Sequence, residues 1–553
     1  MSPTNRIRTT PGVFVTERSA FHSITGVQTA VPAFIGYTAK AVTGGRTAYF
    51  TPVLVNSMAK FEAAFGAAFT TTYDLVEVPS PIGATFTAMR WNATTQAFPS
   101  KYYALVRASR TFNLYNSLRL FYANGGGPCY VVSVGDYTDD GAAPGGVAIN
   151  AGKLTQGLTA IGAQAGPTIL AVPDAVLLQP DATPAHGLPV SAAFNALAQA
   201  MLAQCGALQD RVAILDVYGA DALKPDPNRG VSNSALGYLA ETFQNGVGNS
   251  SLGYGMAYFP FLQTTVVQPG EVDYRNFSIG KADQLALLQG ILTDTAAQIF
   301  PDLEHADPVQ NRDPRFLKIQ DLIAAIATTT DAHAIAQLNQ DLANAIPLLR
   351  QMETVVAAAL NLLPPSGAIA GIYAITDATR GVWNAPANVV VQSVVSSSVK
   401  LSDQQQGPLN APVNGKAINV IRDFVGRGPV VWGARTLDGN SLDYRYIQVR
   451  RTLIYIETSI KTALAQFVFA ANDGKTWVAA TAMVSAFLQN LWSQGGLMGD
   501  KASDAFTVQC GLGSTMTGTD ILDGYMIVQV TLQMIRPAEF IELTFKQKME
   551  GLP

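Results

Sequence analysis

The chain has 553 residues, of which 48% are hydrophobic and only 14% are charged. This length predicts roughly three or four domains, and the low charge content favours large cores or large subunit interfaces. The net charge of −4 is too small to indicate nucleic-acid or membrane binding, and no segment has the length and apolarity of a transmembrane helix.

The first residues and the cysteines both indicate synthesis in a reducing cytoplasm. Residues 1–8 carry charges with no hydrophobic region behind them, so we expect no secretory signal. Cys129, Cys205 and Cys510 lie far apart and predict no disulfide framework. A protein of this kind would leave the cell by lysis or by another non-secretory route.

The N-terminal part of the chain is extended and interrupted by turns. A Thr10-Pro11-Gly12 turn precedes a predicted short strand at 13–17. Residues 27–38 form a second β-rich run, in which Pro32 marks a strand start or an edge strand. Residues 51–100 combine one short helix with aromatic-rich irregular sequence, which is typical of an inserted module or a long ordered loop.

The middle of the chain alternates apolar strands with helices. A predicted helix at 114–123 ends at the breaker Asn124-Gly125-Gly126-Gly127-Pro128. Further strands are predicted at 129–134, 168–172, 211–217 and 255–261, and further helices at 191–204 and 234–244. This alternation predicts a mainly parallel sheet that is covered by helices on both faces.

The remaining sequence is helical first and mixed later. Residues 281–363 keep the three- and four-residue apolar spacing of helices, up to a boundary at Pro364-Pro365-Ser366-Gly367. Long helices are predicted at 446–469 and 476–492, and strands at 525–534 and 540–546.

The last predicted strand has an apolar face and no partner nearby in the sequence. Ile541, Leu543 and Phe545 alternate with polar residues, which is the two-residue period of a half-buried strand. A lone strand is not stable in water, so it must join a sheet. The pattern leaves open whether that sheet belongs to the same subunit or to a neighbour.

The sequence shows none of the usual arrangements for catalysis or cofactor binding. There is no phosphate-binding loop, the glycine run at 125–127 precedes a strand and is better explained as a turn, and the four histidines are scattered. Cys129 and Cys510 have the surroundings of buried core residues. Asp216 ends a strand, where a carboxylate either catalyses or caps the next loop. We therefore expect no cofactor, no metal and no enzyme activity.

Short segments along most of the chain resemble one known family. They are Pro11-Gly12-Val13-Phe14-Val15, the run 26–36, the element 121–132, Pro173-Asp174-Ala175, the segments 363–367, 380–388 and 431–437, and Arg536-Pro537-Ala538-Glu539. Taken together and in this order, they are similar to the sheath proteins of contractile tails. Such tails occur in myophages, R-type pyocins and extracellular contractile injection systems, and the residues do not distinguish among the three.

The resemblance implies a mixed α/β, multidomain structural subunit made in bacteria. Six subunits would form a ring, and rings would stack helically around an inner tube protein. Contraction would drive the tube through a target envelope. The implied partners are further copies of the chain, the inner tube, and baseplate and tail terminator proteins, without nucleic acid and without direct membrane insertion. The finished protein would be part of a phage tail or of an injection particle.

The resemblance also assigns roles to parts of the chain. Residues 1–28 would be an N-terminal arm, residues 29–364 a central and outer α/β domain with insertions near 51–100 and 281–363, and residues 365–553 a C-terminal inner domain. Strand exchange between subunits would use Val13, Phe14, Val15, Ile541, Leu543 and Phe545. The helix at 446–469 would face the tube with Arg450, Arg451, Glu457 and Lys461, although an ordinary solvated helix face fits the same residues.

Two other functions remain open at this stage. The α/β pattern also fits an enzyme with a site that the motifs do not reveal. A sheath-like tail terminator or baseplate component would carry the same family segments.

Overall fold

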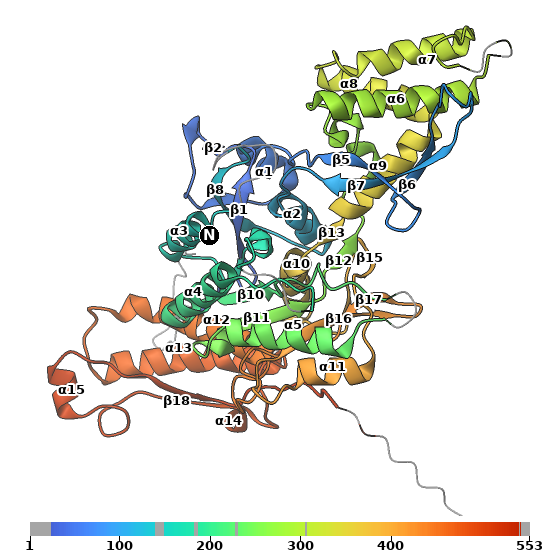
Figure 1. The fold of residues 1–553 in the computed structure, drawn as a ribbon. Helices are drawn as coiled ribbons and strands as arrows, with labels where there is room; N and C mark the ends of the chain where they lie inside the picture. The colour runs from blue at the N-terminus through green and yellow to red at the C-terminus, as the bar shows by residue number, and fades with distance from the viewer. Residues whose placement is uncertain are drawn as a thin grey trace, which may run out of the picture. The chain divides into compact units, whose positions relative to one another are not determined.

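The computed structural model describes residues 24–138, 149–181, 186–226, 230–302, 304, 307–540 and 542. The chain divides into two units (Figure 1). Unit 1 comprises Met1–Val27 and Tyr455–Ile535, and unit 2 comprises Gln28–Ile454 and Arg536–Pro553. Among the described residues, no helix combines the length and the apolarity needed to cross a membrane.

Unit 2 is built on a nine-stranded sheet with the order β14-β17-β16-β11-β10-β9-β1-β8-β4. The pairs from β16 to β8 along this order are parallel, and the pairs at the two ends are antiparallel. The mainly parallel sheet is therefore confirmed. Its strands are β1 Pro32–Thr38, β4 Val53–Val55, β8 Cys129–Asp136, β9 Ile169–Ala171, β10 Val212–Asp216, β11 Gly255–Phe259, β14 Val389–Val390, β16 Ile418–Phe424 and β17 Gly428–Val431.

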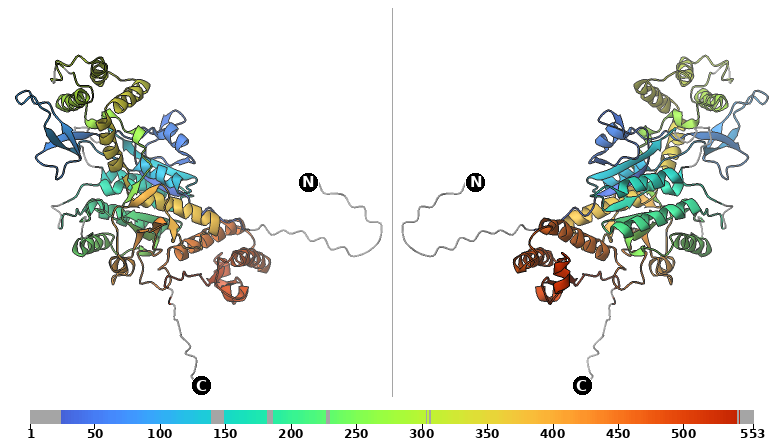
Figure 2. Two further views of the ribbon diagram at one scale, coloured as in Figure 1. Left: turned by 90° about the vertical axis from the view of Figure 1, so that its right-hand side faces the viewer. Right: turned by 90° about the vertical axis from the view of Figure 1, so that its left-hand side faces the viewer.

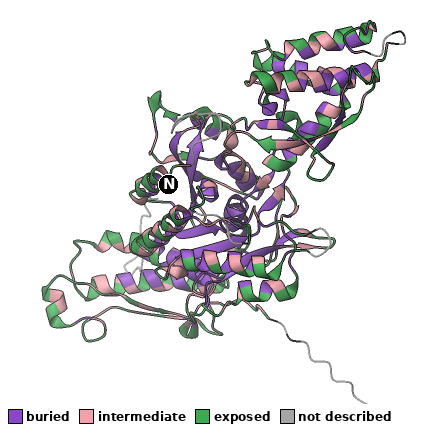
Figure 3. Cartoon of the chain, in the orientation of Figure 1, coloured by how far each residue is buried: buried purple, intermediate pink, exposed green. Residues whose placement is uncertain are grey.

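The central strands are buried on both sides, as their purple colour in Figure 3 shows. In β1, Phe34 packs into one core and its neighbour Ile35 into the other, because successive side chains point to opposite faces. Helices α2 (Leu114–Ala123) and α10 (Ser366–Arg380) contribute to the first core. Helices α3 (Ala151–Gly162), α4 (Ala192–Leu208) and α5 (Asn233–Gly246) contribute to the second.

Local signals in the sequence account for the ends of these elements. Strand β1 is central in the sheet, and Pro32 is its first residue. The missing N–H of proline therefore removes no hydrogen bond from the interior of the strand. Helix α2 ends at Asn124, and Gly125 then takes a left-handed φ of 91°. The Gly126 N–H donates to the Phe121 carbonyl at 3.0 Å, so the glycine run is a helix stop and turn.

The two segments without a family resemblance pack together as one insertion module. A three-stranded sheet of β5 (Tyr73–Val78), β7 (Ser100–Arg107) and β6 (Phe86–Met89) lies against α6 (Ala282–Ile299). The module continues through α7 (Pro314–Ala325), α8 (Ala332–Ala345) and α9 (Pro347–Leu360). Figure 2 shows its blue strands beside its yellow-green helices. Ion pairs join the two segments, Arg90 to Asp294 at 2.6 Å and Lys281 to Asp74 at 2.7 Å.

Shorter elements complete unit 2. A second three-stranded sheet has the order β13-β12-β15. These and the other short elements are β2 Val42–Thr43, β3 Arg46–Thr47, α1 Met58–Phe65, η1 Pro173–Leu177, η2 Leu252–Tyr254, β12 Leu262–Thr264, η3 Pro269–Glu271, η4 Tyr274–Phe277, β13 Leu362–Leu363, β15 Val394–Ser397 and α11 Asp403–Asn410.

Unit 1 is a small α/β unit. The division between the units falls within α12 (Ile447–Leu464), after which come η5 Ala465–Phe467, α13 Gly474–Ser493, α14 Ala502–Ala505, β18 Phe506–Gln509, α15 Gly518–Leu522 and β19 Gln529–Leu532. Strands β18 and β19 pair antiparallel. The predicted strand at 525–534 is therefore confirmed only in its middle. Of the predicted strand at 540–546, Phe540 and Glu542 lie in no strand, and the other residues lie outside the described part.

The mixed α/β, multidomain fold class is confirmed. The boundary predicted between residues 364 and 365 does not separate the two units, because both residues lie in unit 2. Residues 365–454 belong to unit 2, because β14, β16 and β17 complete its main sheet and α10 packs on that sheet. The assignment of 365–553 to an inner sheath domain concerns assembly and stays a prediction.

Candidate functional site

The residues predicted to exchange strands lie outside the described residues. This applies to Val13, Phe14 and Val15 near the N-terminus and to Ile541, Leu543 and Phe545 near the C-terminus. The structure instead places the points from which the two arms depart. Each point is fixed by a specific set of contacts within one unit.

The N-terminal arm starts from helix α12. The Val27 N–H donates to the Ser459 hydroxyl oxygen at 3.2 Å, within unit 1. Gly26 lies so close to Tyr455 that a Cβ atom at this position would be 2.1 Å from the phenol oxygen. A larger residue at position 26 would therefore require either the Tyr455 side chain or the arm to shift.

The C-terminal arm starts in unit 2, beside the segment that follows β17. Glu539 binds the Arg435 guanidinium, with Arg435 Nη2 donating to Glu539 Oε2 at 2.6 Å. Asn410 and Tyr446 also donate to the Glu539 carboxylate, at 2.7 and 3.1 Å. Burial alone would raise the pKa of Glu539, but these donors outweigh it and hold the pKa below its ordinary value. Sequence reasoning missed this cluster, although Glu539 and Arg435 both lie in segments that carry the family resemblance.

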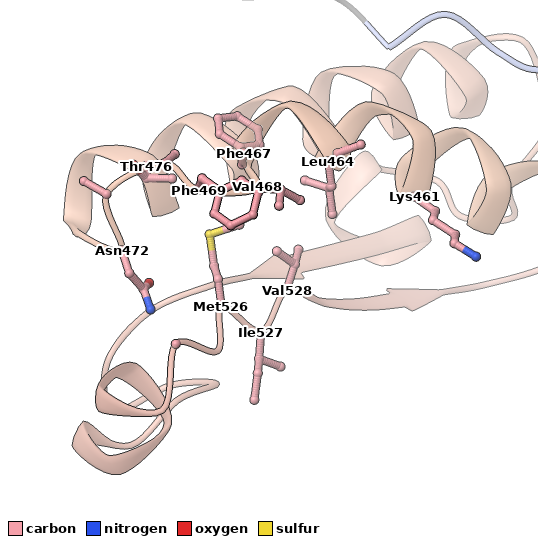
Figure 4. A pocket seen from close by; sticks show the side chains of 14 residues that line it. Lys461, Leu464, Phe467, Val468, Phe469, Asn472, Thr476, Met526, Ile527 and Val528 are labelled. Atoms are coloured by element: carbon pink, nitrogen blue, oxygen red, sulfur yellow. The ribbon is translucent and has the colours of Figure 1, made fainter.

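Unit 1 presents an open apolar groove, which Figure 4 shows. Phe467 and Phe469 come from the segment after α12, and Met526 and Val528 come from the segment before β19. The Phe469 side chain is fully exposed, and its backbone has a left-handed φ of 68°, which is costly for an aromatic residue. Exposed apolar side chains gathered along one groove are typical of an interaction surface.

The β18–β19 sheet next to this groove has free edges. Within the described residues, no third strand pairs with it. Helix α13 packs on β18 and so supports a sheet that two strands alone would not stabilise. Unpaired backbone groups at such an edge can accept an added strand.

The four residues predicted to face the tube do not form one surface. Arg451 is buried in an ion pair with Asp377, with side chains only 3% and 6% exposed. Arg450 is also buried and stacks on the rings of Tyr444 and Tyr254, with distances of 3.7 and 4.3 Å from its guanidinium carbon to the ring centroids. Glu457 and Lys461 are exposed. The role of the latter two stays a prediction, whereas the arginines are occupied inside unit 2.

The possible catalytic carboxylate, Asp216, is a helix cap. Its Oδ1 accepts a hydrogen bond from the Ser366 N–H at 2.8 Å, at the first residue of α10. Burial raises the pKa of Asp216 to about 7, and the hydrogen bonds from Ser366 only partly oppose this. Asp174 plays a similar part, accepting from the backbone N–H groups of Tyr37, Asn113 and Leu114. Both carboxylates are buried structural groups rather than members of a solvent-accessible site.

The cysteines and possible metal ligands form no site in the described part of the chain. Cys129 and Cys205 are buried thiols, and burial raises the pKa of Cys129 to about 12. Cys510 is only half-buried, contrary to expectation, because it follows a strand of the small two-stranded sheet whose residues are half-buried or exposed. Among the described residues, no group of histidine, cysteine, aspartate and glutamate side chains could hold a metal ion.

Replacing Asp216 by Asn should flatten the pH dependence of stability. The folded carboxyl, with a pKa of about 7, keeps a proton that the unfolded chain has already lost. Stability should therefore fall as the pH rises from about 4 to about 7 in the wild type. Asn cannot ionise but can still accept from Ser366, so the difference between about pH 5 and about pH 8 should shrink by on the order of 2 kcal/mol.

Urea unfolding at a series of pH values measures this effect. The matched control is Asp221→Asn, which makes the same change at an exposed position of unit 2. An unchanged slope in Asp216→Asn would contradict the assigned protonation of Asp216.

Comparison with known proteins identifies the family. The model of the phage tail sheath protein central domain matches residues 308–437, and the model of the phage tail sheath C-terminal domain matches residues 440–548. A protein named as a prophage major tail sheath protein of Pseudomonas aeruginosa is 30% identical over 24% of this chain and 35% of its own length. The tail sheath protein of Vibrio phage KVP40 is 27% identical over 24% of this chain and 20% of its own length. The chain thus spans well under two thirds of either curated relative.

Solved structures match over nearly the whole chain. The helical sheath of the anti-feeding prophage in its contracted state is 26% identical, with a TM-score of 0.54 and coverage of 98% of this chain and 100% of that one. The contracted sheath of the extracellular contractile injection system PVC is 23% identical, with a TM-score of 0.51 and coverage of 98% and 99%, and so shares the fold.

The chain belongs to the contractile tail sheath family. Members of this family are structural sheath proteins, so the expectation that the chain is not an enzyme rests on the family and is confirmed.

Proposed function

We propose that the chain is the repeating subunit of a contractile sheath, stacked as hexameric rings around an inner tube. The observation that carries this proposal is the near-complete likeness to the contracted helical sheath of the anti-feeding prophage, at 26% identity and a TM-score of 0.54. Baseplate and tail terminator proteins would close the two ends of the sheath. Contraction would drive the tube through a target envelope.

Subunits would be connected by exchange of terminal strands. Two observations support this proposal: the two-residue apolar period around Ile541, Leu543 and Phe545, and the free edges of the β18–β19 sheet. Backbone hydrogen bonds would supply affinity, and the alternating side chains would set the register. Val13, Phe14 and Val15 would make the second connection, so each subunit would be held at several points and gain effective concentration at each.

Contraction would be a change between two packings of the same subunits. The division of the chain into two units supports a mechanism in which rigid parts move while the arms keep the subunits connected. A small gain in free energy per subunit would be summed over the length of the sheath. This mechanism needs no nucleotide.

Electron microscopy of the purified protein tests the proposal. A sheath subunit concentrated at low ionic strength should form hollow tubes of constant diameter. Small particles of one size under all conditions, including addition of the inner tube, would contradict it.

A second candidate is a sheath-like component of the baseplate. It is favoured by a chain in the baseplate structure of the anti-feeding prophage, which is 25% identical with a TM-score of 0.54 and coverage of 98% and 100%. Such a component would form single rings, or rings only with its partners, instead of long tubes.

Charge reversal at Lys461 tests the contact with the tube. Lys461 is exposed on α12, where a cation could meet acidic groups of the tube. We expect Lys461→Glu to fold and to form sheath as the wild type does, but to lose most of its binding to the inner tube protein, measured by co-sedimentation. The control is Lys475→Glu, an exposed lysine at the start of α13. Equal tube binding by the two variants would show that Lys461 does not face the tube.

A further inference from the structure

The C-terminal segment is held at one well-defined point before it leaves unit 2. Both oxygens of the Glu539 carboxylate are used. Oε1 accepts from Arg435 Nε at 2.9 Å and from Asn410 Nδ2 at 2.7 Å. Oε2 accepts from Arg435 Nη2 at 2.6 Å and from the Tyr446 hydroxyl at 3.1 Å. A paired, charge-assisted contact of this kind fixes direction as well as position.

The receiving side of this contact is rigid. The Arg435 side chain is 9% exposed, and its Nη1 donates to the Asn410 carbonyl at 3.3 Å. Its backbone is held by Asn419 of β16, which accepts from the Arg435 N–H and donates to the Arg435 carbonyl, each at 2.8 Å. The main sheet of unit 2 thus positions the guanidinium before Glu539 binds.

The residues on either side of Glu539 have no comparable contact. Arg536 is half-exposed and its guanidinium lies 4.0 Å from Asp443. Phe540 is 77% exposed, and Glu542 is exposed as well. Glu539 is therefore the last strongly held residue before the predicted exchange strand.

We propose that Glu539 and Arg435 form a latch that sets the point and direction from which the C-terminal strand leaves its own subunit. This inference rests on the proposed function, because it makes Glu539 a positioning residue for strand exchange. With the latch closed, the strand starts next to a rigid sheet. With the latch open, the strand is attached only through residues 536–538 and can sample a larger volume. Its effective concentration at a neighbouring subunit therefore falls.

The latch should open in acid. The donors around the carboxylate hold the pKa of Glu539 below its ordinary value, despite burial. Because the pKa of Glu539 is lowered by folding, the latch is fully closed above the ordinary glutamate pKa of about 4.3. It opens as the pH falls through the lower pKa that Glu539 has in the folded protein. Glu539 is the one carboxylate in this contact, and its partners are a guanidinium, an amide and a phenol, so protonation of Glu539 opens the latch.

Glu539→Gln tests the latch in the full-length protein. Gln keeps the shape of the side chain but loses the charge and one acceptor, so paired binding to Arg435 is broken. We expect the protein concentration needed for half-maximal tube formation at neutral pH to rise about tenfold or more. The control, Glu241→Gln, makes the identical change at an exposed position of α5 in unit 2 and should match the wild type. Chymotrypsin cleavage after Phe540 in the unassembled protein reports the latch without assembly, and Glu539→Gln should be cleaved faster.

The pH profile separates a latch from a general loss of stability. Lowering the pH from about 5 to below the lowered pKa of Glu539 should accelerate cleavage after Phe540 in the wild type and in Glu241→Gln, but not further in Glu539→Gln. Pepsin replaces chymotrypsin in this series because it is active in acid, and its rate at each pH is normalised to cleavage of a peptide substrate. If the wild type forms no tubes under any condition, the proposed function fails while the cleavage assay still measures the latch. Cleavage of Glu539→Gln at the rate of Glu241→Gln would overturn the latch itself. Faster cleavage with tube formation at the wild-type concentration would overturn its positioning role.

Discussion

Replacing Arg451 by Met should destabilise unit 2 by about 3–5 kcal/mol, because it leaves a carboxylate buried without its partner. Arg451 donates to both oxygens of Asp377, at 2.9 and 2.6 Å, and also to the Thr29 carbonyl at 3.0 Å. Its guanidinium lies 4.4 Å from the centre of the Tyr373 ring. Burial lowers the pKa of Arg451, but Asp377 outweighs this effect and the pKa is raised, so Arg451 is charged at neutral pH.

Urea unfolding of the unassembled protein measures the loss. Adding Asp377→Leu to Arg451→Met should recover most of it, since replacing a buried ion pair by apolar groups is often neutral. Lys461→Met is the control on the same helix and should change stability by no more than about 0.5 kcal/mol. A loss in Arg451→Met as small as in Lys461→Met would show that the ion pair contributes little to the folded state.

The contrast between Arg451 and Lys461 shows that the sequence could not distinguish a buried charged residue from an exposed one on the same helix. Both residues lie off the apolar stripe of one helix, and the three- and four-residue spacing describes only that stripe. The partner of Arg451 is Asp377 on α10, a helix that the sequence reasoning did not predict. Burial of a charge depends on such distant partners, so a pattern within one helix cannot reveal it.

The strongly apolar elements were predicted well because their signals lie within the element itself. Helix α2 and strands β8, β9, β10 and β11 carry continuous apolar runs or clear stop signals, and these are local properties. Helix α3 is rich in small residues and gave no clear signal. The insertion module was predicted as two separate segments, because its ion pair between Arg90 and Asp294 joins residues that are far apart in the chain.

For the C-terminal arm, too, the sequence pattern predicted the element but not its partner. The alternation of Ile541, Leu543 and Phe545 predicted a strand without saying where it pairs. Of that segment, Phe540 and Glu542 are described, and they lie in no strand within this chain.

Deleting Phe540–Pro553 should abolish tube formation and leave both units folded. The described residues of this segment, Phe540 and Glu542, are exposed and lie in neither hydrophobic core, and the latch residue Glu539 is retained. An exchanged strand of about five residues at about 1 kcal/mol per hydrogen bond contributes roughly 5 kcal/mol per contact, or between three and four powers of ten in the association constant. The loss repeats at every subunit of a ring and between rings. Electron microscopy and circular dichroism measure assembly and folding separately.

A shorter deletion of Gln547–Pro553 is the matched control, because it keeps the whole predicted strand at 540–546. It should form tubes at close to the wild-type concentration. If both deletions assemble, the C-terminal strand is dispensable and the N-terminal residues Val13, Phe14 and Val15 carry the connection. If both fail, the last residues bind in their own right. Only failure of the longer deletion together with assembly of the shorter one assigns the connection to the alternating strand, because the two variants differ in that strand and in nothing else.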